Sequence, residues 1–198
     1  YLPIWQRPVR PAPAAEVRTA GLRLLDAQLR GPQREQAMLL LMRRAGFLSG
    51  PEQLQLLLTL TTAATPQADT NLRVLLMNGS SSTLRQDAVI SGLGGRELEF
   101  LEGLISDPVC GPEKKEHASL VKRLAQCVTL EGKGPRVDRL LEVASLRKTG
   151  DWQQLALLDG IASTVPAAVK GRPAPAIKPL RFDTQPRGWE ALQRIQVP

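Results

Sequence analysis

The first residues in this sequence that could do chemistry are three closely spaced glycines. Gly92, Gly94 and Gly95 stand directly before an apolar and acidic run, as they would in a loop that holds a phosphate. A dinucleotide-binding loop, however, needs Gly-x-Gly-x-x-Gly after a strand, whereas this segment reads Gly-x-Gly-Gly after a helical pattern. We therefore expect a corner between two helices, closed by a positive φ angle at Gly94 or Gly95. Glu97 and Glu99 would then lie in the first turn of the next helix, where their charge suits the helix dipole and repels a phosphate.

The remaining polar candidates for catalysis lack visible partners. His117 is the only histidine and lies in "KKEHAS", at the polar start of a predicted helix, so we expect it on the surface. Serines 80–82 are expected to form a loop and a helix N-cap, because no neighbouring base would activate a nucleophile there. A hydrolase would need convergent acids such as Asp151 and Asp159, and helical periodicity does not support that arrangement. The sequence therefore predicts no catalytic residue, no metal site and no cofactor.

The two cysteines, Cys110 and Cys127, match no metal, redox or haem motif. Cys127 lies on the apolar face of a predicted helix and is expected to be buried as a small hydrophobic residue. Cys110 is expected in a loop. A disulfide between the two requires that loop to fold back along the helix, and this alternative stays open.

Helical periodicity extends through the middle of the chain, and no segment has the pattern of a strand. Internal prolines, at positions 32, 51, 66, 108, 112 and 135, precede or open these helical patterns, where a missing N–H costs little. The predicted helices cover residues 14–29, 33–46, 51–64, 66–78, 83–93, 95–106, 113–131, 135–148 and 151–165. The three last helices are predicted to bury the faces Leu120, Val121, Leu124, Cys127 and Val128; Val137, Leu140, Leu141 and Ala144; and Leu155, Leu158, Ile161 and Ala162.

The helices form pairs that begin near residues 14, 51, 83 and 113, a spacing of 30 to 37 residues. That spacing is typical of two-helix repeats of the HEAT or armadillo kind. We predict an all-α fold: a right-handed α-solenoid of antiparallel helix pairs with about four to five repeats, between extended proline-rich tails. The domains are then a linker at 1–13, the repeats at 14–165 and a basic segment at 166–198, with a short helix at 187–196.

The net charge of +7 could indicate binding to nucleic acid, but the tails carry most of it. The segment 1–13 contributes +2 and the segment 166–198 contributes +4, so the body between them, with 18 basic and 17 acidic side chains, is +1. No apolar run reaches the roughly 20 residues that span a bilayer, so no membrane span is expected. The chain opens at Tyr1 without a signal pattern, and we expect a piece of a longer protein.

Three blocks carry a resemblance to a known family: "LRQDAVISGLGGRELEFLEGLISDP", "HASLVKRLAQCVTLEGKGPRVDRLLEVAS" and "WQQLALLDGIAS". Their order resembles the HEAT-repeat region of large exported bacterial proteins that join a sorbosone or glucose dehydrogenase-like propeller to a cytochrome c domain. The resemblance covers roughly residues 14–165. It implies a periplasmic or other extracytoplasmic location and a non-catalytic role as a spacer or docking module. In that family the redox chemistry belongs to flanking domains with a Cys-x-x-Cys-His haem site, a motif that this sequence lacks.

The sequence therefore leaves two candidate functions. The favoured one is a helical-repeat scaffold that binds a protein partner or the neighbouring domains of its own full-length chain. The alternative is a HEAT-repeat protein that binds nucleic acid through cations converging on one concave face, although nearby acids could instead pair with those cations. The candidate interaction surface consists of Arg43, Arg44, Arg73, Arg85, Lys122, Arg123, Arg136 and Arg139.

Overall fold

The computed structural model describes residues 14–78, 82–110, 113–146, 151–164, 182 and 184–194. About 80% of these described residues are helical and none of them lies in a strand, which confirms the all-α prediction. The chain divides into two compact units, unit 1 within Tyr1–Ala68 and unit 2 within Asp69–Pro198.

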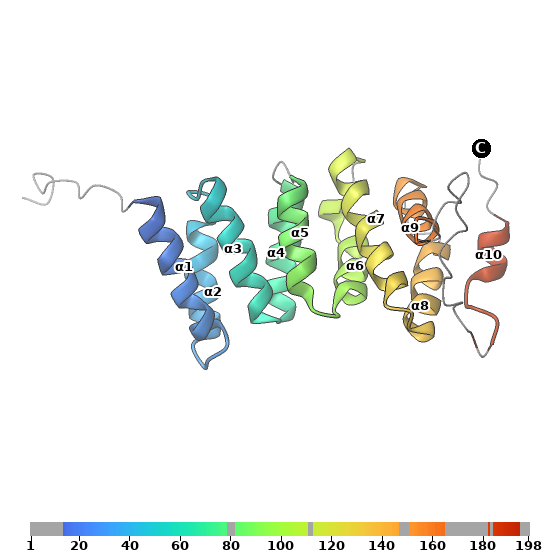
Figure 1. The fold of residues 1–198 in the computed structure, drawn as a ribbon, viewed down its shortest axis with the longest axis horizontal. Coiled ribbons are helices and arrows are strands. Elements are labelled where there is room, and N and C mark those ends of the chain that lie inside the picture. Colours follow the sequence, from blue (N-terminus) through green and yellow to red (C-terminus); the bar gives the residue numbers. More distant parts are fainter. Residues whose placement is uncertain are drawn as a thin grey trace, which may run out of the picture. The chain divides into compact units, whose positions relative to one another are not determined.

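The predicted helices are confirmed, with bounds that differ by at most three residues (Figure 1). They are α1 (Ala15–Leu29), α2 (Arg34–Ala45), α3 (Gly50–Ala63), α4 (Pro66–Asn78), α5 (Thr83–Leu93), α6 (Glu97–Ser106), α7 (Lys115–Leu130), α8 (Gly134–Ser145) and α9 (Asp151–Ala162). A 3-10 turn, η2 (Pro108–Cys110), follows α6, and a short helix, α10 (Trp189–Gln193), lies within the predicted range 187–196. The linker 1–13 and residues 165–181 lie outside the described residues.

Local sequence signals explain where several helices begin and end. In α3, Pro51 lies in the first turn and Ser49 and Glu52 form a reciprocal capping box. The end of α5 is closed by Gly94 in the left-handed conformation, with φ 57°, and Gly95 follows with φ 92°. Glycine takes these angles without a Cβ clash, so the corner predicted before α6 is confirmed.

In unit 1, α1 packs against both α3 and α2. Leucines from each helix are almost fully buried, among them Leu29, Leu41, Leu56 and Leu60. At the same interface the guanidinium of Arg18 pairs with the fully buried carboxylate of Glu52, and the hydroxyl of Thr59 donates to the carbonyl of Leu22. Helices that are two positions apart in the chain therefore share one interface.

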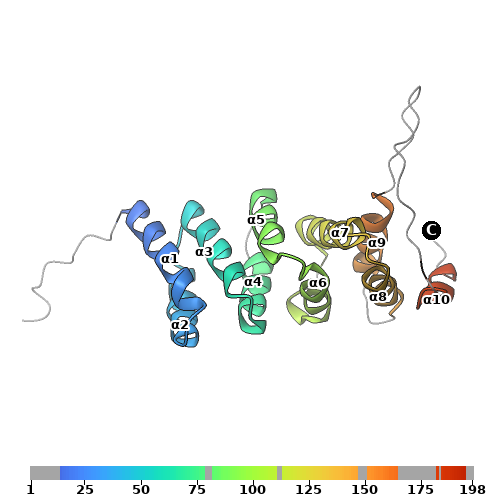
Figure 2. The ribbon, with the colours of Figure 1, turned by 60° about the horizontal axis from the view of Figure 1, so that its bottom comes forward.

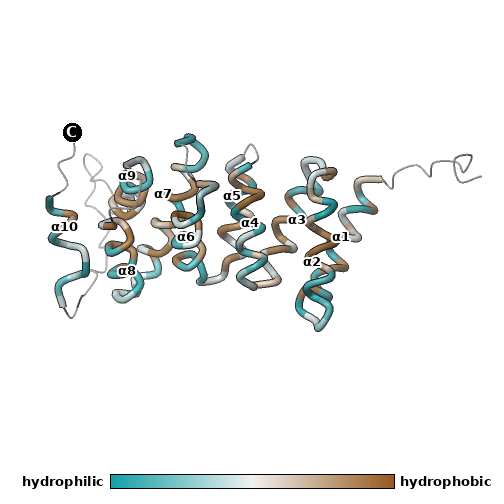
Figure 3. Tube along the Cα trace, turned by 180° about the vertical axis from the view of Figure 1, so that it is seen from behind, coloured by the Kyte–Doolittle hydropathy of each residue, from teal (hydrophilic) through white to brown (hydrophobic). Residues whose placement is uncertain are grey.

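In unit 2, α7 packs most closely against α9, and α6 and α8 pack against α7 (Figure 2). The core contains Phe100, Leu120, Leu124 and Leu140, none of which is exposed. Apolar and polar residues alternate along these helices, as in the helices of unit 1 (Figure 3). The predicted faces of α7 and α8 are confirmed in most positions, although Cys127 and Leu141 are only half-buried.

The predicted buried face of α9 is wrong. Leu155 is half exposed and Ala162 is exposed, whereas Gln153, Ala156, Leu157 and Gly160 are buried. The reason is close packing: at Gly160 the backbone of α9 approaches the carbonyl of Lys122 so closely that a side chain there would overlap it. Ala156 and Gly160 let α9 come close at this face, and Leu157 fills it from the same helix.

Candidate interaction surface

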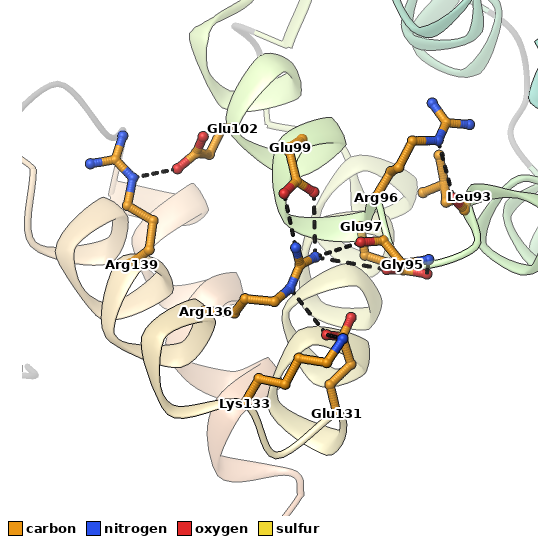
Figure 4. Close-up of polar contacts among 10 residues, drawn as sticks. All are labelled: Leu93, Gly95, Arg96, Glu97, Glu99, Glu102, Glu131, Lys133, Arg136 and Arg139. Atoms are coloured by element: carbon orange, nitrogen blue, oxygen red, sulfur yellow. Dashed lines mark hydrogen bonds and ion pairs between the residues drawn. The ribbon is translucent and has the colours of Figure 1, made fainter. Parts of the chain in front are cut away.

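Arg136, in the first turn of α8, occupies the glycine corner between α5 and α6 (Figure 4). Its guanidinium donates to the Glu99 carboxylate at 2.8 and 3.3 Å and to the carbonyl oxygen of Gly95 at 2.9 Å. It also lies 3.0 Å from the carboxylate of Glu131 and 4.0 Å from that of Glu97. The Arg136 guanidinium therefore occupies the position that a phosphate at this glycine corner would need.

The same corner has no excess of positive charge. Lys133 contacts Glu131 at 3.3 Å, so two cations face the three carboxylates of Glu97, Glu99 and Glu131. Glu97 also accepts a hydrogen bond from the backbone N–H of Gly95 at 3.1 Å. A phosphate placed here would meet carboxylates that are already close to the backbone N–H groups. The arrangement therefore favours a structural corner over an anion site.

Arg139, one turn further along α8, is held by two acids. Its guanidinium donates to Glu102 of α6 at 2.6 Å and to Glu142 at 2.9 Å. The hydrogen bonds to Glu102 and then to Glu142 raise the pKa of the Arg139 guanidinium above its ordinary value. Arg136 and Arg139 together pair α8 with α6, the helix two positions earlier in the chain.

Arg73 of α4 is enclosed by residues of unit 2. Its guanidinium lies 3.7 Å from the carboxylate of Asp107, donates to the hydroxyl of Thr70 at 3.0 Å and lies 5.8 Å from the ring centre of Phe100. The absent side chain of Gly103 makes room for it, because a Cβ there would lie 2.6 Å from Nη1 of Arg73. Arg73 therefore stabilises the packing of α4 against α6.

Lys122 and Arg123 are neighbours on α7 and pair with helices on either side. Lys122 donates to Asp159 of α9 at 2.7 Å, and Arg123 pairs with Asp87 of α5. The pair of Arg123 with Asp87 therefore joins two helices and is not a contact within one helix. These pairs are partly exposed and each contributes at most about 1 kcal/mol.

Among the candidate cations, Arg136 and Arg139 lie close together on α8, and Lys122 and Arg123 lie close together on α7. The two pairs are thus on different helices. Arg85 is half-buried on α5 of unit 2, and Arg43 and Arg44 are exposed in the last turn of α2 in unit 1, where cations suit the helix dipole. Five of the eight candidates, namely Arg73, Lys122, Arg123, Arg136 and Arg139, have carboxylate partners on other helices or, for Arg73, at the C-cap of α6. This pairing weakens the case for a phosphate-binding surface.

His117 is not on the surface as predicted: it is 2% exposed. Its Nε2 lies 3.3 Å from the carbonyl oxygen of Met77, and its ring is 6.5 Å from the ring of Trp152. The prediction failed because "KKEHAS" is polar along the sequence, while only one side of this first helical turn faces solvent. His117 is a core residue that connects α7 to α4 and α9.

Both cysteines are free thiols, so the disulfide alternative is wrong. Cys110 is fully buried in η2, and its carbonyl oxygen accepts a hydrogen bond from Gln153 at 3.4 Å. Burial is the main cause that raises the pKa of both thiols above the ordinary value, and the charge of Glu97 adds to the effect at Cys127. A thiol with a raised pKa is a poor nucleophile at neutral pH.

The remaining candidates give no catalytic arrangement in the described residues. Ser82 is the N-cap residue of α5, as predicted, and Ser80 and Ser81 lie outside the described residues. The Asp159 carboxylate pairs with Lys122, and the side chain of Asp151 is not described. No group of three or more His, Cys, Asp or Glu side chains that could hold a metal ion occurs in the described part of the chain.

Unit 1 has exposed apolar residues that the sequence patterns did not predict. Leu24 is 76% exposed and Phe47 is 83% exposed, and Val17, Leu39 and Leu40 are also exposed. A signal was present in "AMLLLM", because its five consecutive large apolar residues cannot all lie on one face of a helix. Single exposed apolar side chains are common on folded proteins, and a contiguous patch of them is what marks a surface that binds another protein.

Comparison with protein-family models, with curated proteins and with solved structures finds no match to this chain. Among the described helices, none combines the length and the apolar character needed to cross a membrane.

Proposed function

We propose that this chain is a non-catalytic helical-repeat scaffold, a right-handed α-solenoid of about four to five HEAT-like helix pairs. One observation carries the proposal: five ion pairs between helices join residues that are 34 to 37 positions apart along the sequence. Arg18 and Glu52 are 34 residues apart, Arg123 and Asp87 are 36, and three further pairs, Lys122–Asp159, Arg136–Glu99 and Arg139–Glu102, are 37 apart.

A constant separation has a simple physical origin. In a tandem array each repeat contacts only its neighbours, so equivalent helices meet at a separation of one repeat. The separations of 34 to 37 residues agree with the spacing of 30 to 37 residues between the predicted helix pairs. The contacts α1 with α3, α6 with α8 and α7 with α9 have the same origin, because each joins helices two positions apart.

A protein partner is favoured over nucleic acid. The exposed side chains of Leu24, Leu39, Leu40 and Phe47 offer apolar area, while most of the candidate cations already pair with carboxylates. Replacing those pairs by contacts to phosphates would leave buried acids such as Glu97 without a cation.

The resemblance described above extends the proposal to a spacer between domains of a larger exported redox protein. In that arrangement the repeats hold a propeller domain and a haem domain, and any electron transfer takes place outside this chain. The proposed partners are therefore neighbouring domains of the same full-length protein, and the proposed location is extracytoplasmic.

The experiment that separates the two functions is a fluorescence-anisotropy titration with a short DNA duplex and a single strand at several salt concentrations. We expect weak binding that disappears when residues 1–13 and 166–198 are removed, because the body between them has a charge of only +1. Arg43→Ala with Arg44→Ala should change little. Tight and steeply salt-dependent binding by the trimmed chain would instead support the nucleic-acid function.

The scaffold function has its own test. Purified propeller and haem domains of the resembled family are titrated with the full chain, and we expect binding that weakens in Phe47→Ser. Leu155→Ser is the matched control, because Leu155 is also exposed but lies on α9 in unit 2. Absence of binding to either domain, or equal effects of the two substitutions, would count against this choice of partner and surface.

A further inference from the structure

The C-terminal segment, residues 184–194, lies against α8 in unit 2. The backbone N–H of Arg187 donates to the carboxylate of Asp138 at 2.6 Å. The guanidinium of Arg187 reaches the carboxylates of Asp138 and Glu142 at 3.9 and 4.0 Å. The acidic side of α8 therefore binds a basic residue through both its backbone and its side chain.

Gly188, the next residue, fits α8 in a way that other residues do not. Its φ angle is +76°, and a Cβ added to it would lie 2.7 Å from the Cβ of Ser145 and 3.2 Å from the carbonyl oxygen of Leu141. Real carbon contacts are about 3.5 to 4.0 Å, so a side chain would push the segment away from α8. The Arg–Gly pair is thus recognised by charge at one residue and by shape at the next.

Much of the remaining C-terminal segment is exposed to solvent. The side chain of Arg187 is 73% exposed, and Trp189 of α10 is 42% exposed. The pair Glu190–Arg194 is internal to the segment and also exposed. A helix of five residues does not form on its own in water, so α10 gains its structure from contact with α8.

We propose that the face of α8 formed by Asp138, Leu141, Glu142 and Ser145 is a peptide docking site, and that residues 184–194 are its built-in, releasable ligand. The partner that fits this site is a protein segment with an Arg–Gly pair directly before a helical turn. An acidic segment is excluded by Asp138 and Glu142. The inference goes beyond the scaffold function and does not depend on it.

Residues 184–194 belong to the same chain as α8, which explains why few contacts are enough to keep them docked there. A ligand tethered to its own site has an effective concentration on the order of millimolar, so it stays bound even when the same peptide binds weakly from solution. To displace the segment, a partner protein with the same affinity for α8 must be present at a concentration above this effective concentration. Release therefore depends on the concentration and affinity of the competing segment.

The first test uses the full chain with its three tryptophans replaced by 5-fluorotryptophan. The fluorine NMR signal of Trp189, assigned with Trp189→Phe, reports whether the segment is docked. We expect Gly188→Ala to move this signal to its position in a free peptide of residues 182–198, and Asp138→Ala, which weakens docking by about tenfold, to move it part of the way. Arg194→Gln is the control, because the Arg194 guanidinium pairs with Glu190 of the same segment, so the substitution should leave the signal in place. An unchanged signal in Gly188→Ala would overturn the proposal.

The second test asks whether the site accepts a ligand from solution. The full chain with Gly188→Ala keeps α8 intact, so a fluorescein-labelled peptide of residues 182–198 should bind it at least about tenfold more tightly than the wild-type chain, whose site is occupied. Adding Asp138→Ala should weaken that binding by about tenfold, as expected for loss of a hydrogen bond to a charged group. Equal binding to the two chains, or equal binding of a peptide that carries Gly188→Ala, would contradict a docking site on α8.

Discussion

Gly160 allows us to test the close packing of α9 against α7 with one added methyl group. In Gly160→Ala the new Cβ would lie 2.8 Å from the Cβ of Ala125 and 3.1 Å from the carbonyl carbon of Lys122, and closer still to its oxygen. Carbon contacts need about 3.5 to 4.0 Å, so α9 must withdraw by roughly 1 Å. Rotation of a side chain cannot relieve this clash, because the atoms of Lys122 belong to the backbone of α7.

The expected cost follows from two opposing effects. Overpacking against a fixed backbone costs about 3 kcal/mol, and the better helix propensity of alanine returns about 1 kcal/mol. The net loss in the free energy of unfolding is therefore about 2 kcal/mol. Gly21→Ala is the matched control, because Gly21 is exposed within α1 and a Cβ there meets nothing within 4 Å. It should gain about 0.5 to 1 kcal/mol.

The assay is urea denaturation followed by circular dichroism at 222 nm, with amide hydrogen exchange to separate the two units. The midpoint should fall in Gly160→Ala and rise slightly in Gly21→Ala, and the loss of amide protection should be concentrated in α7 and α9. Gly103→Ala should be milder than Gly160→Ala, because its Cβ meets only the movable end of Arg73. A midpoint for Gly160→Ala at or above the wild-type value would refute the close-packing argument.

Three further substitutions probe burial and charge. Leu124→Ala should lower stability by about 2 to 5 kcal/mol by leaving a cavity, and Leu141→Ala, which is half-buried, should cost clearly less in the same urea titration; equal losses would contradict the assigned faces. His117→Ala should cost about 1 to 3 kcal/mol, whereas a surface histidine would change the midpoint by less than about 0.5 kcal/mol. The backbone hydrogen bond from Ser49, followed by the bond from Arg18, lowers the pKa of Glu52 below 4.5. Its stabilisation is therefore present above pH 4.5 and is lost as the pH falls through the lowered pKa. Glu52→Gln should be less stable than the wild type at pH 7 and should show a flatter decline of stability in acid; parallel curves would show that Glu52 contributes nothing.

Sequence patterns predicted the helices well because their signals are local. Pro51 and Pro66 begin helices, Gly94 ends one, and apolar residues recur with the helical period between them. The glycine corner was predicted for the same reason, since the conformations of Gly94 and Gly95 depend on residues within a few positions. Its occupant, Arg136, was not predicted as such, because that contact joins residues 41 positions apart.

Burial was harder to predict where small or polar residues face the core. On α9 the small residues Ala156 and Gly160 let two helices approach, whereas the apolar pattern selected Leu155 and Ala162, which are exposed. His117 is buried inside a polar stretch because the neighbouring helices α4 and α9 cover it. Such contacts are set by tertiary packing, and no pattern within one helix contains them.

The candidate cations illustrate the same limit for the interaction surface. Lys122 and Arg139 read as exposed charges in the sequence, but their partners Asp159 and Glu102 lie 37 residues away on other helices. A sequence search for opposite charges one repeat apart could have found these pairs once the helix-pair spacing was known. The docking of Arg187 on Asp138 has no such signal, because the C-terminal segment lies outside the predicted helix pairs.

Small-angle X-ray scattering of residues 14–164 tests the central claim, the linear stacking of helix pairs, most directly. A compact globule of that length has a radius of gyration of about 15 Å. A solenoid of four to five helix pairs predicts a clearly larger radius and a distribution of interatomic distances with a long tail. A radius near 15 Å with a symmetric distribution would contradict the helical-repeat scaffold.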